Sequence, residues 1–339
     1  MARQKLVNLL TIAVTVLILA GVGYVSLRSG DSHSPKPITI PTGQVSVLLI
    51  SGVVTDPTHA VEWEKALGWN LDIAASFLAW SSDRDVTRTF KEDARQGLAP
   101  MITWEPWQPP KLGTPAREQG AVQPKYSNEA IAAGRLDGYI RRFARTCAAY
   151  GGSIFLRYAH EMNGYWYPWS HDPKAYIKAW RHVYEVFQQE GATNVEWLWG
   201  VGSRLNTTSG SDWWQNTIRY WPGSRYVDWV GATMIDFGRL HEHPVSQFID
   251  RIGRMRALAK PLMLDEVNVN FEQRIPWLTD LRKQLAEAPW IRGLVWSQAP
   301  SRGQQSQRSP GNMDWSTLDD PASARILGQI FREGHQLGS

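Results

Sequence analysis

From residue 45 to the C-terminus, short apolar runs alternate with longer stretches in which apolar positions recur every three to four residues. The short runs have the length and composition of buried strands and span residues 45–50, 72–77, 99–103, 153–158, 195–199, 227–233, 261–264 and 291–296. The longer stretches have helical periodicity and span residues 58–67, 84–96, 128–150, 172–190, 211–221, 244–259, 273–287 and 319–333. A strand followed by a helix, eight times over, predicts an α/β fold in which a parallel sheet closes into a (β/α)8 TIM barrel.

An open, doubly wound parallel sheet is the alternative fold for the same alternation. Its phosphate-binding fingerprint is a glycine-rich turn that leads from a strand into a helix. The glycine-rich segment 200–202 does not open a helix in that way, and we therefore favour the barrel. In such barrels the functional residues lie at the carboxyl ends of the strands and in the loops that follow them.

The N-terminal segment has a different pattern. After Arg3 and Lys5, the chain runs almost without charge over residues 6–27, which is long enough to cross the hydrocarbon core of a bilayer. We predict a transmembrane or signal-anchor helix within residues 1–28, with its basic end in the cytoplasm and the rest of the chain in the periplasm or the extracellular space. Cleavage near the small residues around Gly21 is the alternative and would give a secreted protein.

The rest of the sequence divides into a tether and one body. Residues 29–43 are rich in Ser, Pro and Gly and predict an extended linker, while residues 44–339 form the barrel domain, which we expect to be monomeric. The single cysteine, Cys147, excludes an intrachain disulfide and a multi-thiolate metal site. The net charge of +4 is small, and no run of basic residues is interleaved with aromatics, so nucleic acid is not an expected partner.

Aromatic residues are the unusual part of the composition. The chain has 18 tryptophans, all after residue 62, where ordinary usage would give roughly five. Several stand with polar residues after predicted strands, in a set that comprises Trp104, Glu105, Trp107, His160, Glu161, Asn163, Trp166, Trp169, Asp236, Glu266 and Trp296. Indole rings stack on the apolar faces of sugars, and polar side chains bind sugar hydroxyls. The sequence therefore predicts a carbohydrate-binding cleft at the carboxyl ends of the strands.

Two residues of this set are candidates for hydrolysis of a glycosidic bond. The reaction needs a carboxylic acid that protonates the leaving oxygen and a carboxylate that acts as nucleophile or base. Glu161 and Glu266 directly follow the fourth and seventh predicted strands, whose ends can bring two side chains to about 5 Å, the separation in retaining enzymes. The alternative for each glutamate is a helix cap or an ion pair with an arginine such as Arg157. We predict a retaining glycosidase.

The segment 157–166, with the sequence RYAHEMNGYW, resembles the acid/base segment of glycoside hydrolase family 26. The similarity extends to PMITWEP at residues 100–106 and to KPLMLDE at residues 260–266. The family consists of barrel enzymes that are chiefly endo-β-1,4-mannanases, with mixed-linkage β-glucanases and xylanases among them. The resemblance implies an endo-acting enzyme on a β-linked polysaccharide, such as β-1,4-mannan or β-1,3-1,4-glucan.

The resemblance also implies roles for individual residues. Glu161 would be the general acid/base and Glu266 the nucleophile, His160 and Trp166 would line the subsite around the scissile bond, and Trp296 would lie beneath the sugar as a stacking platform. The other residues that we expect in the substrate cleft are Trp104, Glu105, Trp107, Asn163, Trp169 and Asp236. Arg157 is expected to pair with a carboxylate, that of the nucleophile, and to hold its charge.

Two segments depart from the family pattern. The sixth strand of the family usually ends in a Val-Gly-x-Asp-x-Tyr-Asn string whose tyrosine binds the nucleophile, whereas Ile235 takes that place here and Phe237 has no hydroxyl. The fifth strand usually closes in Trp-Ser-Pro-Asn, and residues 199–202 read WGVG instead. Both changes remove polar groups from the rim of the site, which leaves the substrate and the activity itself open. Asp236 is a candidate for the polar role on the sixth strand.

A carbohydrate-binding protein without catalytic activity is the alternative function. Such a protein would use the same membrane-tethered cleft to hold or guide an exported polysaccharide, and the missing tyrosine favours it. The two glutamates, together with His160 and Asn163, favour an enzyme. The proposed chemistry needs no cofactor. The loop residues His171, His241 and His243 have no helical spacing, so we expect no functional metal.

Overall fold

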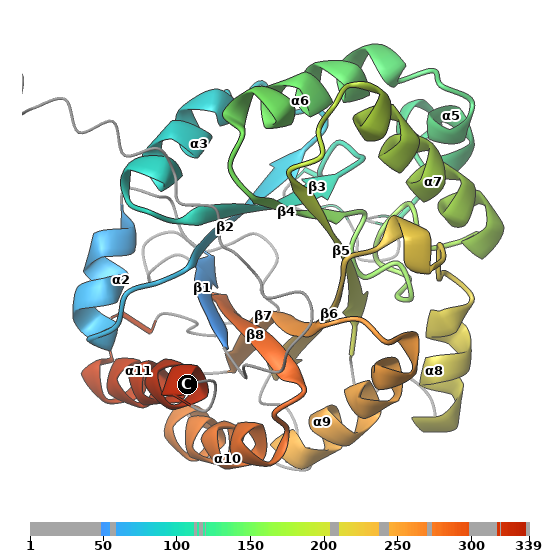
Figure 1. Cartoon of the computed structure of the whole chain (residues 1–339). Coiled ribbons are helices and arrows are strands. Elements are labelled where there is room, and N and C mark those ends of the chain that lie inside the picture. The colour runs from blue at the N-terminus through green and yellow to red at the C-terminus, as the bar shows by residue number, and fades with distance from the viewer. Residues whose placement is uncertain are drawn as a thin grey trace, which may run out of the picture.

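The computed structural model describes residues 49–54, 59–111, 114, 118, 120–203, 210–236, 244–269, 273–297, 317–318 and 320–336. Within these residues, eight parallel strands close into a single barrel in chain order, with β8 paired to β1 (Figure 1). The strands are β1 (Ile50–Val54), β2 (Ile73–Ala79), β3 (Ala99–Glu105), β4 (Ile154–Tyr158), β5 (Val195–Gly202), β6 (Trp229–Asp236), β7 (Leu262–Val269) and β8 (Ile291–Ser297). The predicted (β/α)8 barrel is confirmed.

Helices form a ring around the barrel (Figure 1). They are α2 (Ala60–Leu67), α3 (Val86–Arg95), α5 (Asn128–Ala132), α6 (Asp137–Tyr150), α7 (Pro173–Gln189), α8 (Gly210–Ile218), α9 (Val245–Gly253), α10 (Arg274–Glu287) and α11 (Pro321–Gln336), with short 3-10 turns η2 (Pro124–Tyr126), η3 (Ser224–Tyr226) and η4 (Arg254–Leu258). The stretch 128–150 was predicted as one helix and forms two. Gly134, with φ of 74°, ends the first of them, because a left-handed residue stops helical hydrogen bonding.

Side chains alternate along the strands between the barrel interior and the layer beneath the helices. The interior holds a small apolar cluster made of Ile50, Ile73, Ala75, Ala99, Met101, Phe155, Leu198, Trp229, Met263 and Val295. A larger core fills the layer between strands and helices and contains most of the buried tryptophans. Within it, the ring of Trp180 from α7 lies 5.9 Å from that of Trp197 on β5. The excess of tryptophan therefore serves packing as well as any cleft.

Several strands reach further toward their carboxyl ends than the apolar runs predict. β3 ends at Glu105, β6 ends at Asp236 and β7 continues to Val269, so Glu266 lies inside its strand and does not follow it. The reason is that polar side chains at the mouth of a barrel face its interior while the backbone keeps its strand hydrogen bonds. At the other end of the sheet, β1 begins at Ile50, and the residues 45–48 of the predicted first strand lie outside the described part of the chain.

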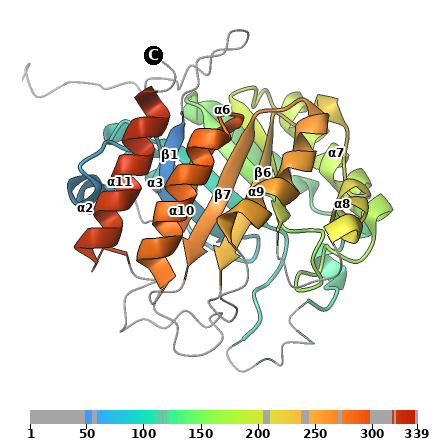
Figure 2. The same ribbon diagram turned by 90° about the horizontal axis from the view of Figure 1, so that it is seen from below.

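The two ends of the barrel are distinct. Figure 2 shows the arrowhead of β7 at one end and the carboxyl end of α11 at the other. Leu49, at the start of β1, donates a backbone hydrogen bond to the carbonyl of Gly334 in α11 (3.2 Å). The chain thus enters the barrel at the end opposite the one where the strands finish.

Among the residues that the structure describes, no helix is long and apolar enough to cross a membrane. The predicted anchor in residues 1–28 and the predicted linker in residues 29–43 both lie outside those residues. Both therefore stay predictions from the sequence.

Candidate active site

The backbone turns sharply after β4 and fixes the position of Glu161. Ala159 and Glu161 have φ angles of 43° and 53°, in the left-handed region that is costly for residues with a side chain. The neighbouring strands hold this turn. The N–H of Ala159 donates to the carbonyl of Trp104 on β3 (3.1 Å), and the N–H of Glu161 donates to the carbonyl of Gly200 on β5 (2.8 Å). Glu161 is thereby anchored between two strand ends.

A β-bulge in β7 places two consecutive carboxylates in the barrel. Gly231 of β6 is opposite Met263 and Thr233 is opposite Glu266, so β7 has one residue more than β6 over the same length. Adjacent residues of a regular strand face opposite sides of the sheet, but a bulge disrupts this alternation. Asp265 and Glu266 therefore both point to the interior.

Arg157 of β4 is the centre of the polar network and is only 1% exposed. Its Nε lies 3.0 Å from Oδ2 of Asp265, and its Nη1 donates to Oε2 of Glu266 (2.9 Å). Its Nη2 donates to Oγ1 of Thr233 (2.8 Å). Burial alone would lower the pKa of the guanidinium, but the charges of Asp265, Glu266 and Glu161 outweigh this effect and raise it. The predicted pairing of Arg157 with a carboxylate is confirmed.

Glu161 lies in an environment that favours its protonated form. Desolvation raises the pKa of Glu161, and the negative charge of Glu266 raises it further. Three interactions oppose this rise: the charge of Arg157, a hydrogen bond from Thr233, and a hydrogen bond from Nε1 of Trp166 to Oε2 of Glu161 (2.6 Å). The net result is a carboxyl group that keeps its proton to higher pH than an ordinary glutamate.

Glu266 has different partners. Its carboxylate faces the cation of Arg157, and its second oxygen, Oε1, accepts a hydrogen bond from Oγ of Ser297 (3.3 Å). The side chain remains 13% exposed. Two carboxyl groups with different partners thus share one barrel mouth, and acid-assisted nucleophilic displacement at a glycosidic bond requires such a pair.

Three of the predicted cleft residues form a buried aromatic group. His160, Trp107 and Trp169 are only 1 to 2% exposed, and the rings of all three pack against Tyr167 at centroid distances of 4.5 to 5.1 Å. Nε1 of Trp169 donates to the carbonyl of His160 (2.8 Å). Trp107 and Trp169 therefore offer no stacking surface for a sugar, and the group instead supports the turn that carries Glu161.

Trp104 and Trp296 were predicted to line the cleft, and this prediction is wrong. Both are fully buried in the layer between the barrel and the helices. Trp104 stacks on Phe143 of α6 at 4.5 Å, and Nε1 of Trp296 donates to Oγ1 of Thr317 (2.9 Å). The reason is strand alternation: the neighbours of Trp104 and Trp296 in their strands face the interior, as Thr103 does on β3 and Val295 on β8.

Asn163 is engaged with the backbone of β5. Its Nδ2 donates to the carbonyl of Gly202 (2.8 Å) and its Oδ1 accepts from the N–H of the same residue (2.9 Å). Nδ2 also donates to Oγ1 of Thr217 in α8 (2.9 Å). Asn163 thus fastens the loop after β4 to the end of β5. Glu105 is 2% exposed at the end of β3, and Asp236 is partly exposed at the end of β6.

The sequence did not single out Asp265, Thr233 or Ser297, although each contacts a group of the polar network. Asp265 directly precedes Glu266, and in a regular strand the two side chains would face opposite sides of the sheet. Ser297 supplies the hydroxyl next to Glu266 that the missing tyrosine would have supplied. Tyr165 was also missed and is 66% exposed, with its ring edge-on to Trp166 at 5.2 Å.

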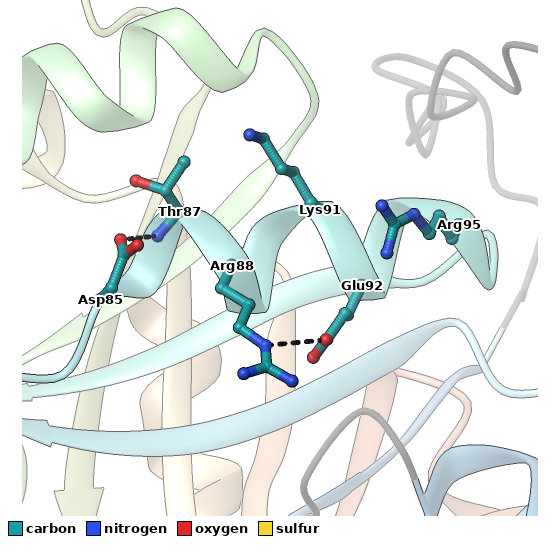
Figure 3. A pocket seen from close by; sticks show the side chains of 6 residues that line it. All are labelled: Asp85, Thr87, Arg88, Lys91, Glu92 and Arg95. Carbon is teal, nitrogen blue, oxygen red and sulfur yellow. Dashed lines mark hydrogen bonds and ion pairs between the residues drawn. The ribbon is translucent and has the colours of Figure 1, made fainter.

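A depression runs along the outer surface of α3 (Figure 3). It is lined by Asp85, Thr87, Arg88, Lys91, Glu92 and Arg95. Asp85 caps the helix by accepting from the N–H of Thr87 (2.9 Å), and Arg88 pairs with Glu92 (3.1 Å). These are the ordinary interactions of an exposed helix, and the depression shares no residue with the barrel mouth.

Residues 127–299, about half of the chain, match the family model described as glycosyl hydrolase family 26. The matched region contains both Glu161 and Glu266, and it runs from the start of α5 to just beyond the end of β8.

Two curated relatives are similar to this chain. Over 196 residues it is 32% identical to Endoglucanase H of Acetivibrio thermocellus. The aligned region covers 55% of this chain and 19% of the relative. Over 127 residues it is 30% identical to "Mannan endo-1,4-beta-mannosidase A and B" of Caldalkalibacillus mannanilyticus. This aligned region covers 34% of this chain and 22% of the relative. The matched part of the chain therefore spans about a fifth of the length of each of these proteins.

Among solved structures, a family 26 β-mannanase from Bacteroides ovatus has a similar fold. The two share 15% sequence identity with a TM-score of 0.59, over 85% of this chain and 89% of the other. At this level of identity the similarity concerns the fold alone.

Proposed function

This chain belongs to glycosyl hydrolase family 26, and from this premise we propose that it is a retaining glycoside hydrolase that cleaves a β-linked polysaccharide. The observation that carries the proposal is the pair of glutamates around Arg157. Glu266 forms an ion pair with the guanidinium, while burial and the charge of Glu266 raise the pKa of Glu161. We assign Glu161 as general acid/base and Glu266 as nucleophile.

The proposed reaction is a double displacement. In the first step Glu266 attacks the anomeric carbon, and Glu161 gives its proton to the leaving glycosidic oxygen. Glu266 loses its negative charge when it becomes an ester, which removes the repulsion that raises the pKa of Glu161. The pKa of Glu161 then falls, so that this residue can accept a proton from the water that attacks the intermediate in the second step. The product keeps the β-configuration of the substrate.

The relatives support an endo-acting enzyme on β-mannan or on a β-glucan, since one is named an endoglucanase and the other a mannan endo-1,4-beta-mannosidase. The exposed ring of Tyr165 and the partly buried Trp166 are the aromatic surfaces that we assign to sugar stacking. The alternative of a carbohydrate-binding protein without activity gains no support from these relatives. The presence of Ser297 next to Glu266 also weakens it, because the nucleophile has a hydroxyl partner after all.

We further propose that the enzyme works outside the cytoplasm, held at the membrane by residues 1–28. The support for this is the apolar run 6–27 behind two basic residues. The start of β1 lies at the end of the barrel opposite the strand ends. A tether that enters there leaves the mouth free to meet a polysaccharide.

The test is incubation of the full chain, in detergent, with β-mannans, mixed-linkage β-glucans, xylans and cellulose. Released oligosaccharides are followed by mass, and the anomer formed first is identified by NMR. β-Configured products from one of these polymers would support the proposal and name its substrate. α-Configured products would contradict the retaining mechanism, and binding without any release would favour the protein without activity.

Removal of the indole donor to Glu161 gives a prediction about pH. In Trp166→Phe the hydrogen bond that stabilises the Glu161 carboxylate is lost, so the pKa of Glu161 is expected to rise. The basic limb of the kcat/KM profile, which reports the general acid of the free enzyme, should move to higher pH. We expect kcat at the optimum to fall on the order of tenfold. A profile that keeps its basic limb in place would show that Trp166 does not act on Glu161.

A further inference from the structure

Asp265 is a buried carboxylate that the double displacement does not use. Its side chain is 0% exposed and lies 3.0 Å from Nε of Arg157. Burial of an ion pair costs desolvation of both partners, and replacement by apolar residues is often neutral or stabilising. A buried aspartate in the middle of a site is therefore a poor choice for stability alone. Its place next to the nucleophile suggests a part in the chemistry.

The strands β5 and β6 have glycines where they face the Asp265 carboxylate, and these glycines leave the space that it occupies. A Cβ atom on Gly200 of β5 would lie 2.3 Å from Oδ2 of Asp265, and a Cβ atom on Gly231 of β6 would lie at the same distance. Either contact is far inside van der Waals distance, so neither position accepts a side chain while Asp265 stays in place. Two glycines and the bulge of β7 thus build one space for the Asp265 carboxylate.

The charges around Asp265 are few. Arg157 and Glu161 reach it from β4 and the turn that follows, and Glu266 is its neighbour in β7. From β5 and β6 the adjacent residues are the uncharged Gly200 and Gly231. Burial raises the pKa of Asp265 to about 7 in spite of Arg157, and the charges of Glu266 and Glu161 act in the same direction as burial. Three carboxyl groups therefore share one guanidinium.

We propose that Asp265 is a positioning residue of the reaction: it holds the Nε edge of Arg157, so that Nη1 faces Glu266 and Nη2 faces Thr233, and it takes up part of the guanidinium charge. The orientation presents Arg157 to the nucleophile. Arg157 favours the carboxylate form of Glu161 through its charge, and its hydrogen bond to Thr233 connects it to the Glu161 carboxyl group. Because Asp265 takes up part of the guanidinium charge, this effect on Glu161 is weaker, and Glu161 keeps its proton for the first step. This inference rests on the proposed function, in which Glu161 must begin the reaction protonated.

The test is Asp265→Asn, which keeps the shape of the side chain and removes its charge. Arg157 would then act undivided on Glu161, and the basic limb of the kcat/KM profile is expected to move to lower pH, by about one pH unit. This is opposite to the shift expected for Trp166→Phe, which serves as the matched comparison. A purely structural role would lower the rate at all pH values and leave the limbs in place. A folded Asp265→Asn protein with an unmoved basic limb would overturn the inference.

A second readout does not depend on turnover. The titration of Glu161 can be followed by NMR in protein with 13C-labelled glutamate carboxyl groups, its resonance being assigned by its loss in Glu161→Gln. A titration at lower pH in Asp265→Asn than in the unaltered protein supports the inference even if no polymer is cleaved, in which case only the proposed function fails. If the unaltered protein cleaves a polymer but the Glu161 titration is unchanged in Asp265→Asn, the inference is wrong and the proposed function stands. If Asp265→Asn does not fold, Asp265→Ser removes the charge with a smaller side chain.

Discussion

Glu266→Ala is expected to abolish hydrolysis of polysaccharides and of activated aryl β-glycosides alike, with a loss in kcat on the order of 10⁴-fold or more. The reason is that a leaving group of any quality still needs a nucleophile at the anomeric carbon. The ion pair with Arg157 at 2.9 Å and the hydrogen bond from Ser297 hold the Glu266 carboxylate in place for that attack. No other carboxylate in the described structure has the same pair of partners.

The matched control is Glu287→Ala, which removes an exposed glutamate at the carboxyl end of α10 and should leave kcat unchanged. Added azide provides a stereochemical check, because it can enter the space left by the Glu266 side chain and displace the leaving group directly. The product of the Glu266→Ala protein would then be an α-glycosyl azide. Residual activity above a tenth of the original would show that Glu266 is not the nucleophile.

The barrel and its main catalytic candidates follow from patterns that are local in the sequence. Each strand is a short apolar run, and each helix is a longer amphipathic stretch, so eight repeats are visible without knowledge of tertiary contacts. Glu161 and Glu266 could be selected because they stand beside the fourth and seventh of these runs. Arg157 could be assigned to a carboxylate because an arginine inside a barrel strand needs one.

What the sequence did not predict depends on strand alternation and on one irregularity of the sheet. Trp104 and Trp296 stand at the right places along their strands but face outward, since the phase of each strand is set by its interior neighbours, such as Thr103 and Val295. The bulge of β7 brings Asp265 and Glu266 to the same side of the sheet, where a regular strand would separate them. A bulge is a property of the pairing between β6 and β7, and neither strand shows it when read alone.

The two segments that depart from the family pattern are partly explained by the same geometry. Gly200, in the segment that replaces Trp-Ser-Pro-Asn, leaves the space in which the Asp265 carboxylate lies. The hydroxyl lost with Ile235 on β6 is matched by Ser297 on β8, which donates to Glu266 from the other neighbouring strand. Polar groups that are absent at one strand end thus have counterparts at another. Glu266 thus has a cation and a hydroxyl group as partners.

Glu161→Ala is expected to have an effect that depends on the leaving group. Hydrolysis of polysaccharide should fall by about 10²- to 10⁴-fold, because a sugar alkoxide is a poor leaving group when no acid protonates it. An aryl β-glycoside with an acidic phenol leaves unaided, so its first step should keep most of its rate. Water then attacks the glycosyl-enzyme without a general base, and the intermediate on Glu266 should accumulate, visible as a burst of phenol and as added mass on the protein.

Two further measurements complete this prediction. The basic limb of the pH profile should disappear in Glu161→Ala, because the group whose raised pKa produces it is gone. Azide should accelerate the second step and give a β-glycosyl azide, the opposite anomer to the one expected from Glu266→Ala. Glu62→Ala, at an exposed glutamate of α2, is the control and should behave as the unaltered protein. Equal losses on the polysaccharide and on the activated aryl glycoside would contradict the assignment of Glu161 as acid/base, because the acid is needed only where the leaving group is poor.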